Sequence, residues 1–323
     1  MSDKLLGSFV WCELLTTNTA AAEGFYKKVV GWTSAPFAPD GSYTTFSGPA
    51  GAVAGLMLLP DEAKKMGAPP NWMMYVGTPN VDSTALRVAQ LGGKVLKQPT
   101  DIPNTGRFAV VQDPYGATFG LYTPATPGTP KEKPGVGDFS WFELYTPSPD
   151  GAWTFYQSLF GWEKTSAMDM GAMGVYQMFG RGGGIPNGGI MKPPPGAPAA
   201  WMPYAMVKDA KAAAATAQAN GGKIINGPME VPGGDWIAQG IDPQGAMFAV
   251  HSLKPKAAAA TKAAPKKTAA KKKAAPASAK ASAGKPKKAK AAKRAKPIKK
   301  SVRKAAKKAA KKAAKKKAAR RKK

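Results

Sequence analysis

The sequence predicts an α+β protein built from two tandem copies of one domain and followed by a basic tail. Residues 7–32 and 137–162 share their Trp, Glu-Leu, Phe-Tyr and Gly-Trp positions at an offset of 130. The match continues at an offset of 129 as far as two Asp-Pro-x-Gly segments, at 113–116 and 242–245. A repeat of this length indicates a doubled domain, because the units of solenoids span only about 20 to 50 residues. The predicted divisions are 1–127, 128–253 and 254–323.

The charge of the chain is concentrated in the tail. The 323 residues include 48 Lys and Arg against 19 Asp and Glu, a net charge of +29. Of these basic residues 31 lie in 254–323, where there is no acidic residue, so the two domains keep 17 basic and 19 acidic residues and a net charge of −2. The body is therefore expected to be a near-neutral globular protein.

Other features of the sequence indicate the cellular compartment of the protein. The only cysteine is Cys12, so an internal disulfide is impossible. The N-terminus lacks the pattern of a signal peptide, and no apolar run approaches the roughly 20 residues that span a bilayer. The sequence predicts a soluble cytoplasmic protein, with a nucleoid association if the tail binds DNA.

Each copy is expected to begin with a strand and a helix. Alternation in residues 9–14 predicts a strand with Phe9, Trp11 and Glu13 on one face, which leaves Cys12 on the opposite, core face. Asn18 and the Ser-Pro-Asp at 148–150 are typical of helix N-termini. Apolar residues then recur with helical spacing, and a glycine ends each helix. The stripes are Ala22, Phe25, Val29 and Trp32, and Ala152, Phe155, Leu159 and Trp162, and the glycines are Gly31 and Gly161.

The rest of each copy reads as strands around a second helix. Further strands are predicted at 43–46, 53–58, 174–179 and 189–191, with an irregular Gly/Pro-rich loop at 180–198. In the first copy a strand at 72–77 precedes a helix at 81–91 and strands at 94–97, 108–112 and 118–122. The Asp-Pro-x-Gly segments carry the residues that a type I turn favours, so each joins the last two strands as a hairpin.

These features resemble the vicinal oxygen chelate superfamily, which includes glyoxalase I, bleomycin-resistance proteins and extradiol dioxygenases. The resemblance is carried by the Phe-Tyr and Gly-Trp pairs, the Leu-Gly-Gly-Lys-Val at 91–95 and the Asp-Pro-Tyr-Gly at 113–116, each with a counterpart in the second copy. It covers nearly all of residues 7–252. It implies that each domain consists of two βαβββ modules whose sheet curls into an open trough.

Members of that superfamily that use a metal place His, His or Gln, and Glu at three strand positions in the trough. Alignment on the shared motifs puts Trp11, Met73 and Gly120 at these positions in the first domain. Trp141, Met202 and Ala249 occupy them in the second. None of these side chains is a good ligand for Zn, Fe or Mn, so we expect no metal and no other cofactor.

Without a metal, each trough is expected to be an apolar, aromatic cavity with one carboxylate, a composition typical of small-molecule sites. A buried carboxylate must be paired or have a raised pKa, so Glu13 and Glu143 are either bonded to a neighbouring tyrosine or backbone group or act as general bases. The aromatic residues could also simply fill a closed core, and His251 could be an edge residue. The predicted ligand-binding residues are Phe9, Trp11, Glu13, Met73, Tyr75 and Tyr122, and Phe139, Trp141, Glu143, Met202, Tyr204 and His251.

The tail consists mainly of Ala, Lys and scattered Pro, with no aromatic residue. It is expected to be disordered alone and to bind DNA without sequence specificity, as its resemblance to linker-histone tails also suggests. Its proline-free segment 301–323 is expected to become helical on nucleic acid. Other polyanions or an anionic membrane surface are the alternative partners. The predicted DNA-binding residues are Lys271, Lys272, Lys273, Lys287, Lys288, Lys307, Lys308, Lys311, Lys312, Lys315, Lys316, Arg320 and Arg321.

Three functions remain open at the sequence level. The first is a metal-free protein that binds a small apolar or aromatic molecule and is tethered to DNA. The second is a cofactor-independent lyase, isomerase or hydroxylase-like enzyme that uses Glu13 or Glu143. The third is a nucleoid-associated scaffold. The sequence leaves the oligomeric state open, and the two copies could themselves form a pseudo-dimer.

Overall fold

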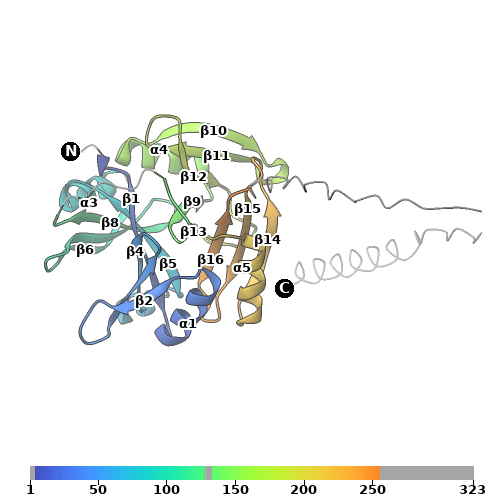
Figure 1. Cartoon of the computed structure of the whole chain (residues 1–323). Coiled ribbons are helices and arrows are strands. Elements are labelled where there is room, and N and C mark those ends of the chain that lie inside the picture. The colour runs from blue at the N-terminus through green and yellow to red at the C-terminus, as the bar shows by residue number, and fades with distance from the viewer. Residues whose placement is uncertain (1–3, 127, 129–132, 255–323) are drawn as a thin grey trace, which may run out of the picture. The chain divides into compact units, whose positions relative to one another are not determined.

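Two eight-stranded sheets, one per sequence repeat, make up the body of the protein (Figure 1). The structure is a computed structural model that describes residues 4–126, 128 and 133–254. The strand orders are β2-β3-β4-β1-β5-β8-β7-β6 and β10-β11-β12-β9-β13-β16-β15-β14, so the second sheet repeats the first strand for strand. This confirms the predicted α+β fold of paired βαβββ modules.

The strand boundaries agree with the repeat. The first sheet contains β1 (Phe9–Thr16), β2 (Thr33–Pro36), β3 (Tyr43–Gly48), β4 (Gly51–Leu58), β5 (Asn71–Gly77), β6 (Lys94–Ile102), β7 (Gly106–Gln112) and β8 (Thr118–Pro124). The second contains β9 (Phe139–Tyr145), β10 (Glu163–Asp169), β11 (Val175–Gly180), β12 (Pro186–Met191), β13 (Ala200–Met206), β14 (Lys223–Glu230), β15 (Trp236–Ile241) and β16 (Met247–Ser252).

The helices of the described residues are α1 (Thr19–Val29), α2 (Asp61–Lys65), α3 (Val81–Gln90), α4 (Pro149–Phe160) and α5 (Ala210–Ala219), and a 3₁₀ turn, η2, spans Gly171–Met173. The side chain of Asn18 caps α1 by accepting a hydrogen bond from the backbone N–H of Ala21. Pro149 occupies the first turn of α4, which ends at Gly161 in the left-handed conformation. Within the described residues, no helix is long and apolar enough to cross a membrane.

Several short elements were missed at the sequence level. Strands β2 and β10 and helix α2 had no predicted counterpart, because each is mostly exposed and carries little apolar patterning. Within the predicted irregular loop at 180–198, the strand predicted at 189–191 is confirmed as the end of β12, which begins earlier, at Pro186, and pairs with both β9 and β11. Strand β6 also runs to Ile102, well beyond the predicted end at 97.

One hydrophobic core, which we call the central core, joins the two sheets. It includes the helical stripes of α1 and α4 and the core-facing residues of both sheets, Cys12 among them. Helix α1 lies beside α5, and α3 lies beside α4, so the two longer helices of the first repeat each contact a helix of the second (Figure 1). The body is therefore one packed unit, although its sequence is a doubled domain.

The motif residues of the repeat form the polar contacts across this core. The Tyr26 hydroxyl accepts a hydrogen bond from Trp72 Nε1 at 2.9 Å and donates to Asp242 Oδ2, in the other repeat, at 3.0 Å. The second repeat has the reciprocal relay: Trp201 Nε1 donates to Tyr156, which donates to Asp113 Oδ2, at 2.9 and 3.0 Å. Two further tryptophans form hydrogen bonds between the repeats. Trp32 Nε1 donates to the carbonyl oxygen of Gly137, and Trp162 Nε1 donates to that of Gly7. The repeated Tyr, Trp and Asp residues of the shared motifs thus form polar contacts within and between the two domains.

Candidate functional site

The face of the first sheet that points away from the central core carries a separate apolar cluster, which we call the first trough. Its buried members are Leu15, Leu59, Met73 and Tyr75. Half-buried aromatic residues from three strands complete it, and part of the surface of these side chains remains exposed to solvent. The half-buried members are Val10, Trp11, Met57, Ala63, Ala68, Phe108, Val110 and Tyr122.

Glu13 lies in the first trough with tyrosines as its partners. The Tyr75 hydroxyl donates to Glu13 Oε2 at 2.9 Å. The Tyr43 hydroxyl, which accepts a hydrogen bond from Trp11 Nε1 at 3.0 Å, is hydrogen-bonded to the same carboxyl group. Burial raises the pKa of Glu13 above its ordinary value, and the two tyrosines oppose that shift. The carboxyl group is thus both paired and perturbed, so pairing and general-base chemistry are compatible here.

The second trough, on the corresponding face of the second sheet, contains a more extensive polar network. Glu143 accepts hydrogen bonds from Tyr176 at 2.9 Å, Tyr204 at 3.0 Å and Gln239 Nε2 at 3.2 Å. Tyr145 is a fourth partner. Burial raises the pKa of Glu143, and these four groups oppose the shift. The apolar members of the second trough are Trp141, Met202, Ala249 and Ile237.

Two of the predicted ligand-binding side chains lie outside the troughs. Phe9 stacks on Phe142 of the second repeat, with ring centroids 3.7 Å apart. Phe139 packs against Trp32 and Trp72 of the first repeat, with centroids 5.6 and 5.5 Å away. The register of each first strand shifts immediately after this phenylalanine. A β-bulge of this kind interrupts the alternation of faces, so the assumption of strict period two was wrong at these positions.

His251 bridges two parts of the second domain at the side of its trough. One ring nitrogen, Nδ1, lies 2.8 Å from Ser140 Oγ on β9, and the other, Nε2, lies 3.1 Å from Asp235 Oδ2 before β15. Its side chain is 15% exposed. With both nitrogens engaged, the imidazole joins two strands rather than pointing freely toward a ligand.

The three positions that would hold a metal in this fold do not fit one. They lie on adjacent strands β1, β5 and β8, as the alignment requires, but Trp11 and Met73 offer no suitable donor. At Gly120 the ring of Tyr75 fills the space of a side chain, since an added Cβ would lie 2.1 Å from it. Among residues 4–254 as described, no group of three or more His, Cys, Asp or Glu side chains is close enough to share a metal ion.

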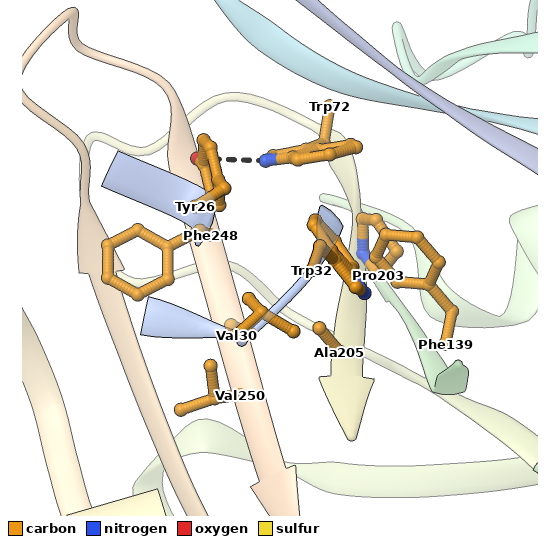
Figure 2. A pocket seen from close by; sticks show the side chains of 10 residues that line it. Tyr26, Val30, Trp32, Trp72, Phe139, Pro203, Ala205, Phe248 and Val250 are labelled. Atoms are coloured by element: carbon orange, nitrogen blue, oxygen red, sulfur yellow. Dashed lines mark hydrogen bonds between the residues drawn. The ribbon is translucent and has the colours of Figure 1, made fainter. Parts of the chain in front are cut away.

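A small cavity lies in the central core rather than in a trough. It is lined by Tyr26, Trp32, Trp72, Phe139 and Phe248, and Figure 2 shows these rings closing around it. Its volume is about 10 Å³, which is space for one water molecule at most. It is therefore a packing defect between the domains and cannot bind a metabolite.

Sequence reasoning missed several partners of the buried carboxylates. Tyr43 and Tyr176 lie on β3 and β11, which do not neighbour β1 and β9 in the sheet order, so the distance along the chain gave no sign of contact. Gln239 was hidden because its equivalent in the first repeat is Val110. A useful signal was present in the repeated Tyr at 43 and 176, each of which follows a glycine-rich turn.

Comparison with known proteins identifies the family. Residues 8–121 match the Glyoxalase/Bleomycin resistance protein/Dioxygenase superfamily. The chain is 36% identical over 251 residues to "Putative glyoxylase CFP32" of Mycobacterium tuberculosis, covering 76% of this chain and 94% of that protein. It is 29% identical over 264 residues to "Anthracycline biosynthesis protein DnrV" of Streptomyces peucetius, covering 77% of this chain and 94% of the relative.

Solved structures with low sequence identity share the fold. The Mn(II)-bound glyoxalase from Novosphingobium aromaticivorans superposes with a TM-score of 0.55 at 16% identity, over 79% of this chain and 85% of that chain. The 2,3-dioxygenase LapB from Pseudomonas sp. KL28 gives a TM-score of 0.55 at 12% identity, over 79% and 94% of the two chains. The match of residues 8–121 to the family and the 36% identity to the mycobacterial relative, over 94% of its length, show that the chain belongs to the Glyoxalase/Bleomycin resistance protein/Dioxygenase superfamily.

Proposed function

We propose that the body binds a small apolar or aromatic molecule in a trough without using a metal, and that the tail attaches the protein to DNA. The observation that carries the first part is the composition of the three strand positions. Where the fold would place metal ligands, this chain has Trp11, Met73 and Gly120, beside half-buried aromatic side chains. Aromatic walls with a few convergent polar groups are typical of ligand pockets.

A panel of small aromatic compounds tests this function by thermal shift on the full chain, with and without a chelator. A ligand present at 100 times its Kd stabilises the folded state by about 2.7 kcal/mol. For a body of this size that should raise Tm by roughly 5–10 °C. We expect at least one compound to raise Tm by this amount, and by the same amount with and without the chelator. No shift with any compound, or a shift only with added metal, would contradict the proposal.

An enzyme without a cofactor is the second candidate for the body. It is favoured by the raised pKa values of Glu13 and Glu143, because a carboxylate whose pKa lies closer to neutrality is a better general base. The reaction would be of the lyase, isomerase or hydroxylase-like kind. Product formation from a compound that binds, lost in Glu13→Gln or Glu143→Gln, would establish this function in place of simple binding.

The DNA-binding part of the proposal concerns residues 255–323, which lie outside the described residues. It is supported by the composition of residues 254–323, where 31 basic residues occur without an acidic one. Such a segment neutralises phosphates and releases their counterions, and this gives affinity without base recognition. A nucleoid-associated scaffold, in which the troughs have no ligand, would share this tail and would be distinguished by the thermal-shift panel.

A further inference from the structure

The two troughs differ at two positions next to their carboxylates. Leu15 of β1 is replaced by Tyr145 of β9, and Val110 of β7 is replaced by Gln239 of β15. The glutamates themselves, and their principal tyrosine partners, are the same in both domains. The number of hydrogen-bond donors around each carboxylate is therefore what distinguishes the two sites.

In the second trough the carboxylate has its full set of partners. Three tyrosines and Gln239 surround Glu143, and a carboxylate accepts about four hydrogen bonds. Gln239 is 6% exposed, and its own carbonyl oxygen accepts from Asn226 Nδ2 at 3.0 Å. A buried network in which each member is bonded is rigid and costly to disturb. Little acceptor capacity remains for a ligand there.

In the first trough, among the residues that the structure describes, the partners of the carboxylate are Tyr43 and Tyr75. Leu15 and Val110, which replace the extra donors, are hydrocarbon side chains and cannot donate to Glu13. A carboxylate can accept about four hydrogen bonds, so two tyrosine partners leave Glu13 able to accept from a further donor. Val110 is half-buried, whereas its counterpart Gln239 is buried, and the two glutamates themselves are similarly buried, with 8% of Glu13 and 6% of Glu143 exposed.

The first trough contains aromatic and thioether side chains. Trp11, Phe108 and Tyr122 are half-buried and come from three different strands, and the thioether side chains of Met57 and Met73 lie in the same cluster. Aromatic and thioether groups both pack favourably against an aromatic ring. Helix α2 adds Ala63 to one side of the trough, whereas the corresponding connection in the second domain, residues 192–199, is irregular.

We infer that the ligand site is the first trough, that its ligand is an aromatic molecule carrying a hydroxyl group, and that this hydroxyl donates a hydrogen bond to Glu13. The second trough is a structural element, in which Glu143 is occupied by its own side-chain network. This inference rests on the proposed small-molecule binding and deepens it by naming the site, the polar contact and the class of ligand.

Isothermal titration calorimetry of 2-naphthol and of 2-methoxynaphthalene with the full chain tests whether the first trough, and not the second, is the ligand site. The two probes share one aromatic body, and only the first can donate a hydrogen bond. A hydrogen bond to a charged group contributes enough binding free energy to change Kd by roughly tenfold or more. We expect the wild-type protein to bind 2-naphthol at least about tenfold more tightly, and Glu13→Gln to bind the two probes with similar affinity.

Two matched variants locate the effect in one domain. Glu143→Gln should keep the preference for 2-naphthol, with any loss confined to Tm. The double variant Leu15→Tyr, Val110→Gln introduces the donors of the second trough and keeps Glu13, so it should lose the preference without removing the carboxylate. The double variant also tests the inference if Glu13→Gln fails to fold.

The outcomes separate the inference from the proposed function. If both probes bind equally to the wild-type protein, or if Glu143→Gln alone removes the preference, the inference is overturned while small-molecule binding stands. If neither probe binds and no compound of the aromatic panel shifts Tm, the proposed function fails and the inference fails with it. Loss of the preference in both Glu13→Gln and the double variant supports the inference.

Discussion

Asp113→Ala is expected to lower the stability of the whole body by about 3 kcal/mol or more. The carboxylate of Asp113 accepts three hydrogen bonds, from the backbone N–H groups of Tyr115 and Ala117 at 2.9 Å each and from the Tyr156 hydroxyl at 3.0 Å. Asp113 is 2% exposed, and each buried donor left without a partner costs about 1–3 kcal/mol. The corresponding fall in Tm is roughly 6–12 °C for a body of this size.

The repeat offers a matched replicate for this experiment. Asp242 accepts from the N–H groups of Gln244 and Ala246 and from the Tyr26 hydroxyl, at 2.9, 2.9 and 3.0 Å. Asp242→Ala should therefore cost about as much as Asp113→Ala. In both variants we expect one unfolding transition, because the central core is continuous across the two sheets. Two separate transitions, one sensitive to each variant, would contradict a single packed body.

A double-mutant cycle separates the turn from the contact between the domains. Tyr156→Phe removes only the hydroxyl that reaches Asp113 from the other repeat. Side chains that share a hydrogen bond typically show coupling energies of about 0.5–3 kcal/mol. We expect coupling in this range between Tyr156→Phe and Asp113→Ala in chemical unfolding. Strict additivity would show that Asp113 acts only within its own turn.

Removal of residues 254–323 is expected to abolish DNA retention at low salt and to leave Tm of the body unchanged. For the full chain, the logarithm of the binding constant should fall with the logarithm of salt concentration, with a slope of about 0.7–0.9 per phosphate neutralised. A tail that contacts 6–10 phosphates would lose roughly 10³–10⁵ in affinity between 50 and 200 mM salt. Electrophoretic mobility or anisotropy measured at several salt concentrations provides this slope.

Two controls define what the tail recognises. Two duplexes of unrelated sequence should bind equally, because the Lys/Ala-rich composition of the tail favours contacts to phosphates, which carry no sequence information. Replacing Lys307, Lys308, Lys311 and Lys312 by Arg should keep most of the affinity, whereas Gln at the same positions should reduce both the affinity and the salt slope. Equal DNA binding by the truncated chain would show that the tail is not the tether.

The fold was largely predictable because the local sequence signals for its helices, strands and turns occur in both copies of the domain. Apolar stripes such as Phe25 and Val29, the glycine that ends each helix and the Asp-Pro-x-Gly turns are local signals, and each occurs in both copies. Local signals do not show which faces of two domains meet. The roles of Tyr26 and Tyr156, whose hydroxyls cross to the other repeat, became visible only in the structure.

The troughs were predictable only in part. Trp11, Glu13 and Tyr75 do share a face of the first sheet, and pairing of the glutamates with tyrosine was one of the two alternatives. Phe9 was misplaced because a bulge consumes one residue without leaving a clear mark in the sequence. The two carboxylates differ because Val110 stands in the first domain where Gln239 stands in the second. The sheet order, and not any local sequence pattern, brings these residues close to Glu13 and Glu143.

The central claim is that the troughs of this superfamily member work without a metal ion. The measurement that tests it most directly is the metal content of the purified full chain after incubation with Zn²⁺, Mn²⁺, Fe²⁺ and Ni²⁺ and removal of the excess. We expect far less than one ion per chain, with ligand-induced thermal shifts unchanged by chelation. One tightly held ion per chain, lost together with ligand binding in Glu13→Gln, would contradict the claim.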